Sequence, residues 1–242
     1  MKNISFLVLC ASLITGSYSL IVLPFGNGAE EIPPPEEILA PEPVALLEGK
    51  NLILAAYRDE EFREDVLAFF GNITGSREIA EVILSNSSVY NVPPALAFSL
   101  CAEESAFNPR AVNRNKNETI DRGLFQLNSS SFPKLTMDEF FDPWENARYG
   151  ISHLRWCLDA AGNEVSGLAM YNAGATRVRS AGTPKHTLDY VHRIFKRQDT
   201  IEDQFKAEYI RMVEERSAKV ELAVEKKRTR FNLSLLNPLG RK

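Results

Sequence analysis

Apolar side chains recur at three- and four-residue steps along most of the chain, which predicts a succession of helices. The clearest pattern covers residues 142–162, where Asp142 and Glu145 predict a capping box and Gly162 a stop. In residues 91–107, two prolines fall in the first turn, where a helix needs no amide donor. The other predicted helices cover residues 44–70, 76–90, 163–174 and 184–197.

One stretch departs from the helical pattern. Residues 113–128, NRNKNETIDRGLFQLN, gather Asn and Asp as turn formers and then alternate through Thr119 and Leu127. Several helices with one small β-hairpin predict a mainly α domain of the α+β class.

The first residues of the chain predict export. Residues 1–28 carry one Lys and no other charge, and the apolar run from Ile4 to Leu23 is long enough to span a bilayer. Three interpretations stay open: a cleaved signal peptide ending near Ser19, a membrane anchor, and lipidation at Cys10. Each sends the protein to the periplasm or cell envelope, and an uncleaved anchor would attach it to the inner membrane.

The rest of the chain divides by composition. Residues 29–43 alternate acidic residues with proline and predict an extended linker. Residues 44–75 predict an N-terminal helical segment, 76–197 the main domain, and 198–242 a charged helical tail. The tail has a thin apolar stripe, which lapses at Arg216 and comprises Ile201, Phe205, Met212 and Val220.

Composition excludes several classes of function. Of the 242 residues, 44 % are hydrophobic and 25 % charged, and the net charge of −4 argues against nucleic-acid binding. The sequence has no phosphate-binding or dinucleotide-binding glycine motif, and its three histidines are isolated, so we expect neither cofactor nor metal. Cys101 and Cys157 predict either one disulfide or two separate buried thiols.

Two adjacent glutamates end the predicted helix of residues 91–107. Glu104 follows Ala97, Leu100 and Cys101 at helical steps, so it shares an apolar face. Partial burial would keep a proton on its carboxyl, as a general acid requires. Glu103 has a similar face, so periodicity alone does not choose between the two.

Four motifs in a fixed order carry a family resemblance. EESAFNPRAV, GLFQLN, AMYNAG and DYVHRI resemble those of the soluble lytic transglycosylase (SLT) domain, whose lysozyme-like fold cleaves bacterial peptidoglycan. The resemblance covers roughly residues 76–197. It implies peptidoglycan glycan strands as the binding partner and names no protein partner.

The resemblance also implies site residues. Glu104 matches the family's single catalytic acid, and Tyr190 matches a tyrosine whose hydroxyl approaches that acid. Gly123 would let backbone and sugar come close. The residues with implied substrate-binding roles are Ser105, Gln126, Tyr171, Asn172 and Tyr190.

The loop before GLFQLN departs from the family pattern. It is longer than usual and resembles that of animal lysozymes, in which a Glu and a later Asp have the spacing of Glu104 and Asp121. Asp121 is therefore either a second carboxylate or a hairpin aspartate, bonded to the turn or paired with Arg122.

Three functions follow from these alternatives. In a transglycosylase, Glu104 protonates the glycosidic oxygen and the sugar's own 6-hydroxyl closes onto the anomeric carbon. In a lysozyme-type muramidase, Asp121 stabilises the cation and water completes the hydrolysis. The third is a non-catalytic wall-binding scaffold. We favour the first, because the motifs after the loop follow the transglycosylase pattern.

Overall fold

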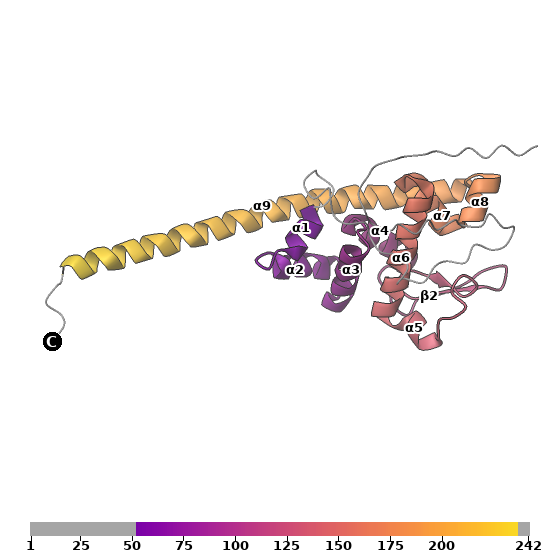
Figure 1. The fold of residues 1–242 in the computed structure, drawn as a ribbon, viewed down its shortest axis with the longest axis horizontal. Helices are drawn as coiled ribbons and strands as arrows, with labels where there is room; N and C mark the ends of the chain where they lie inside the picture. Colours follow the sequence, from indigo (N-terminus) through magenta and orange to yellow (C-terminus); the bar gives the residue numbers. More distant parts are fainter. Residues whose placement is uncertain (1–51, 237–242) are drawn as a thin grey trace, which may run out of the picture.

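The structure, a computed structural model, describes residues 52–236 (Figure 1). Within the last helix, it describes side chains up to Lys219, together with Leu222 and Lys226. The predicted signal or anchor, Cys10 and the linker of residues 29–43 lie outside this range. The helices are α1 (Leu52–Arg58), α2 (Arg63–Thr74), α3 (Arg77–Val89), α4 (Pro94–Ser105), α5 (Met137–Phe141), α6 (Pro143–Ala161), α7 (Glu164–Ala173), α8 (Ala175–Ala181) and α9 (Lys185–Leu236).

Helix α4 forms the centre of the core. Every residue from Pro94 to Ala102 is buried, and the ring of Phe98 stacks on that of Phe70 at 4.2 Å between centroids. The helix ends at Ala106, which has a left-handed backbone with φ of 49°. The two glutamates of its last turn therefore stand where the central helix leaves the core.

A small antiparallel sheet follows α4. Its strands β1 (Val112–Arg114), β2 (Ile120–Arg122) and β3 (Leu127–Asn128) lie in the order β1-β2-β3. The predicted hairpin thus gains a short third strand. The predicted fold class, mainly α with a small β element, is confirmed.

Asn146 of α6 fixes the sheet to the helices. Its buried side chain accepts from the Phe125 amide at 2.8 Å and donates to the carbonyls of Arg122, at 3.0 Å, and Phe140, at 2.8 Å. Gly123 has φ of 78°, and a Cβ there would lie 2.2 Å from the Asn146 amide nitrogen. Gly is required at this position because Asn146 fills the space of a Cβ, and the close approach of a sugar to its backbone stays a prediction.

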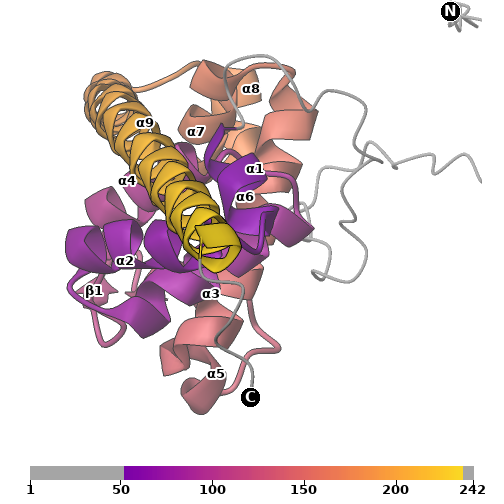
Figure 2. The ribbon, with the colours of Figure 1, turned by 90° about the vertical axis from the view of Figure 1, so that its left-hand side faces the viewer.

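Helix α9 is longer than the pattern predicted. The helix expected over residues 184–197 and the charged helix after it form one continuous element, which packs on α4 and α7 and then extends past the domain (Figures 1 and 2). The predicted stripe is buried at Ile201, Phe205 and Met212, whereas the side chain of Val220 lies outside the described set.

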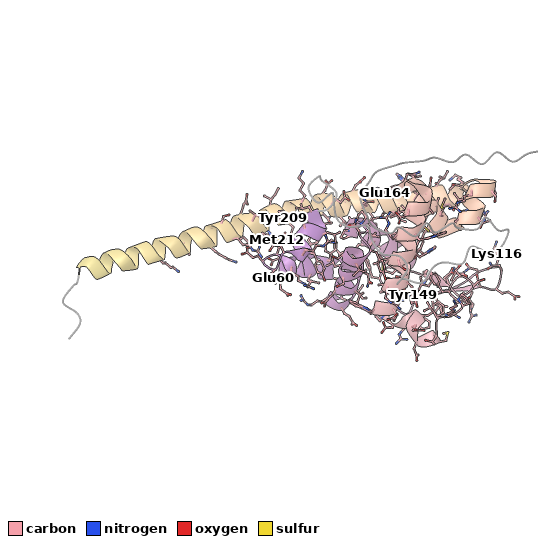
Figure 3. The ribbon with its side chains drawn as sticks, in the orientation of Figure 1. Glu60, Lys116, Tyr149, Glu164, Tyr209 and Met212 are labelled. Carbon is pink, nitrogen blue, oxygen red and sulfur yellow. The ribbon has the colours of Figure 1, made fainter. Side chains whose placement is uncertain are left out.

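Helix α2 and the turn before it contact the middle of α9. The predicted helix of residues 44–70 is interrupted between α1 and α2, where the Asp59 side chain accepts from the Glu61 amide at 2.9 Å. The rings of Phe62 and Tyr209 then lie 5.1 Å apart between centroids. Figure 3 labels Glu60 of this turn and Tyr209 and Met212 of α9. The Arg216 guanidinium lies over the Phe62 ring and donates to Asp65 of α2. The apolar stripe of α9 is therefore interrupted at Arg216 because this residue makes a polar contact with α2.

The predicted capping box of α6 is only half formed. The Asp142 side chain accepts from the Glu145 amide at 2.8 Å, but the Glu145 carboxylate bonds Arg148. A complete capping box stands one helix earlier, between Thr136 and Glu139. The start of α6 was nevertheless predicted at the right residue, because the Asp142 cap and the following proline suffice to define it.

Candidate active site

Glu104, the candidate acid, lies in the last turn of α4 and faces α9. Glu104 is half-buried, and its Oε1 accepts a hydrogen bond of 2.5 Å from the buried Tyr190 hydroxyl. Burial and the neighbouring Glu104 raise the pKa of Tyr190 well above its ordinary value, so the phenol remains a donor. The structure thus brings together two residues that the sequence placed in separate motifs.

The surroundings of Glu104 keep it protonated. Burial raises its pKa to about 8; the Tyr190 bond opposes this rise, and the charges of Asp121 and Glu103 add to it. A carboxyl that holds a proton near neutral pH can serve as a general acid. The apolar face that the sequence predicted is real, since Ala97, Leu100 and Cys101 are all fully buried.

Glu103 has a different environment from its neighbour. Its Oε1 accepts from Arg193 Nε at 2.8 Å and Arg193 Nη2 at 2.6 Å. The pair joins the last turn of α4 to α9. Periodicity could not distinguish the two glutamates, but their partners do: one pairs with an arginine, the other with a phenol.

Tyr171 and Gln126, the tyrosine and glutamine of the motifs, both bond backbone carbonyls of the loop after β2. The Tyr171 hydroxyl donates to the Phe125 carbonyl at 2.9 Å. Gln126 has a left-handed backbone with φ of 47°, and its amide donates to the carbonyls of Gly123, at 2.9 Å, and Ala111, at 3.2 Å. These bonds fix both side chains before any ligand binds.

Asn172 and Ser105 are also held by the protein. The Asn172 side-chain oxygen accepts from the buried Thr187 hydroxyl at 2.9 Å, which joins the end of α7 to the start of α9. The Ser105 hydroxyl donates to the Cys101 carbonyl at 3.2 Å. Each keeps further hydrogen-bonding capacity for a sugar.

Asp121 lies on β2 within an amide cluster. Its Oδ2 accepts from Asn115 at 2.8 Å and Asn113 at 3.3 Å, and its Oδ1 accepts from Asn128 at 2.6 Å. Arg122 does not take the role of ion partner, since its guanidinium lies over the Phe140 ring at 5.1 Å. The carboxylate is thus bonded within the sheet and close enough to Glu104 to influence its pKa.

Three parts of this arrangement were missed from the sequence: the Arg193 pair, the Thr187 contact and the amide cluster around Asp121. Arg193 could have been found, because it follows Tyr190 by three positions and so shares its helix face. The amide cluster had no such signal, since asparagines in a turn-rich loop are ordinary turn formers.

The cysteines and histidines do not form a further centre in the described residues. Cys101 and Cys157 are buried thiols and do not form a disulfide, so the disulfide alternative is wrong. Burial lowers the pKa of His153 to about 4, and its ring stacks on Trp156. Within residues 52–236, no group of three or more His, Cys, Asp and Glu side chains could hold a metal ion.

Comparison with known proteins identifies the domain. Residues 81–193 match the family model of the transglycosylase SLT domain. This segment is an SLT domain. It runs from within α3 to the third turn of α9 and contains every candidate site residue, with Arg193 as its last matched position.

Two bacterial proteins are similar to this segment. Invasion protein IagB of Salmonella typhimurium is 28 % identical over 107 residues, which cover 42 % of this chain and 67 % of IagB. Protein IpgF of Shigella flexneri is 27 % identical over 114 residues, or 45 % of this chain and 72 % of IpgF. Helices α1 and α2 and most of α9 lie outside the SLT match.

Proposed function

We propose that this chain is a peptidoglycan lytic transglycosylase, which cleaves the β-1,4 bond between N-acetylmuramic acid and N-acetylglucosamine and leaves 1,6-anhydromuramic ends. The observation that carries the proposal is the half-buried Glu104, whose pKa is raised to about 8 and whose carboxyl is bonded by Tyr190. The test is incubation of the purified chain with purified sacculi, from which it should release soluble muropeptides. Intact sacculi would contradict an enzymatic function.

In the first step, the protonated carboxyl of Glu104 donates to the glycosidic oxygen as the bond to the muramic C1 breaks. The departing sugar takes the proton and the bonding electron pair, and an oxocarbenium-like centre forms at C1. The Tyr190 hydroxyl stabilises the carboxylate that Glu104 becomes, because a donor favours the charged form.

In the second step, the 6-hydroxyl of the same muramic residue attacks C1. The Glu104 carboxylate takes the hydroxyl proton, so the acid is regenerated and no water is consumed. A nucleophile tethered to the reacting sugar has a large entropic advantage over captured water. Gln126 and Tyr171 would bind the glycan beside Glu104.

A second candidate is lysozyme-type hydrolysis. It rests on the charge of Asp121, which lies close enough to raise the pKa of Glu104. In that reaction Asp121 would stabilise the cation and water would attack C1. Both oxygens of Asp121 accept hydrogen bonds from asparagine side chains, an environment that suits either a structural carboxylate or a second catalytic one. The preference for the transglycosylase therefore rests on the motifs that follow the loop.

The variant Asp121→Asn separates the two candidates. For a transglycosylase we expect a loss of about tenfold or less in kcat/KM, because the change alters local hydrogen bonds and removes only one of several causes that raise the pKa of Glu104. For a hydrolase the same change removes a charge facing the cation and should cost about a hundredfold or more. The measurement is muropeptide release, with a melting curve as the control for folding.

We also propose that the protein acts in the periplasm or cell envelope, where an SLT domain meets its substrate. Among the described residues, no helix is long and apolar enough to cross a membrane. The proposal therefore rests on residues 1–28. A fusion of residues 1–45 to a reporter active only outside the cytoplasm should give signal, and deletion of Ile4–Leu23 should abolish it. A signal that survives the deletion would contradict this origin of export.

A further inference from the structure

Two neighbouring residues of α4 meet two residues on one face of α9. Tyr190 donates to Glu104 at 2.5 Å, and Arg193 holds Glu103 with bonds of 2.8 and 2.6 Å. Tyr190 and Arg193 are three positions apart, so they lie one above the other on the helix. The first turns of α9 thus bind two adjacent carboxyls in two different ways.

These carboxyls belong to a crowded group of ionisable side chains. Glu103 is the acidic neighbour in sequence, and its charge favours the protonated form of Glu104. Arg193 is a cation in direct contact with that charge, and Asp189 stands near it on the same helix. The ionisable residues facing Glu104 are Cys101 and Glu103 of α4, Asp121 of β2, Tyr171 of α7 and Tyr190 of α9.

The two side chains of the Arg193–Glu103 ion pair differ in their exposure to solvent. The Glu103 side chain is 16 % exposed, whereas that of Arg193 is 54 % exposed. Without the guanidinium, Glu103 would keep a largely enclosed negative charge beside the proposed acid. Both Arg193 bonds go to one oxygen, Oε1, so they also fix the direction of that carboxylate.

We propose that Arg193 is a positioning residue, which by holding the Glu103 carboxylate sets the pH range in which Glu104 keeps its proton. The inference rests on the proposed function, in which Glu104 is the acid. A pair that merely joined α4 to α9 would affect stability and leave this pH range unchanged.

The proposal predicts shifts of opposite sign. Activity requires protonated Glu104, so kcat/KM for muropeptide release should fall as pH rises through about 8. Arg193→Gln leaves the Glu103 charge uncompensated. The midpoint of the decrease in kcat/KM should therefore move to a higher pH, by about half a unit. Glu103→Gln removes that charge, so the midpoint should move to a lower pH.

Three further variants isolate the mechanism. Arg193→Lys keeps the positive charge and should restore most of the wild-type profile. Arg193→Gln made on top of Glu103→Gln should cause a smaller shift than it does alone, because the charge it compensates is gone. Lys206→Gln makes the same charge change at an exposed position of α9 and should leave the profile in place.

A second measurement does not depend on catalysis. In protein carrying ¹³C-labelled glutamate carboxyls, the Glu104 signal, assigned by its loss in Glu104→Gln, should titrate with the same opposite shifts. Absence of muropeptide release by the wild type would contradict the proposed function, while this titration would still test the role of Arg193. Equal or same-direction shifts for Arg193→Gln and Glu103→Gln would overturn that role.

Discussion

Replacement of Glu104 by Gln is expected to abolish muropeptide release, with a loss of about a hundredfold or more in kcat/KM. General acids contribute about 10²–10⁴ to rate, and the amide keeps the shape of the carboxyl but cannot give up a proton. In the proposed mechanism, the same carboxylate also takes the proton from the 6-hydroxyl. The measurement is release from sacculi near pH 6, where Glu104 is protonated in the wild type.

Stability should change in the opposite direction. The folded-state pKa of Glu104, about 8, lies above its ordinary value of 4.5. Between these values the unfolded state binds fewer protons, so this carboxyl lowers the free energy of unfolding increasingly as pH rises toward 8. Gln has no such charge, and Glu104→Gln should melt at or above the wild-type temperature at pH 7.

The matched control is the neighbouring position. Glu103→Gln removes a charge one residue away and should remain within about tenfold of the wild type near pH 6, because it alters only the surroundings of the acid. If Glu103 proves essential and Glu104 dispensable, both the helix face and the assignment of the motif are wrong.

The largest expected loss of stability belongs to Asn146→Ala. The change leaves the Phe125 amide and the carbonyls of Arg122 and Phe140 without their side-chain partner in a buried region. Each buried polar group left unsatisfied costs about 1–3 kcal/mol, so the free energy of unfolding should fall by about 3 kcal/mol or more. Urea unfolding at fixed pH measures it.

Asn163→Ala is the control for this loss. Asn163 caps α7 by accepting one bond from the Ser166 amide at 2.8 Å, and it lies on the surface. Loss of such a cap costs about 1 kcal/mol. A smaller effect at Asn146 than at Asn163 would show that the sheet does not depend on the buried amide.

Much of the fold could be predicted from local patterns. Pro94 and the apolar run behind it define α4, and Asp142 and Gly162 mark the two ends of α6. These signals act within one turn of a helix, so the sequence alone is enough to read them. The same holds for the burial of Glu104, which follows from its apolar neighbours at helical steps.

Other features depend on contacts between distant segments. The left-handed backbone of Gln126 has no local signal, because it follows from bonds to the Gly123 and Ala111 carbonyls. The continuity of α9 was missed at residues 197–198, because the buried face there passes through the polar side chain of Gln198 between Ile194 and Ile201. The approach of Tyr190 to Glu104 was expected only through the motif resemblance, because nothing in the local sequence links two residues 86 positions apart.

The most direct test of the central claim is the mass of the released muropeptides. Purified sacculi should be digested with the wild-type protein, and the products analysed by mass spectrometry without prior reduction. If Glu104 draws the proton from the sugar's own 6-hydroxyl, the muramic ends will be 1,6-anhydro and one water lighter than hydrolytic ends. Reducing muramic ends, together with a large loss in Asp121→Asn, would contradict the account and assign the site to hydrolysis.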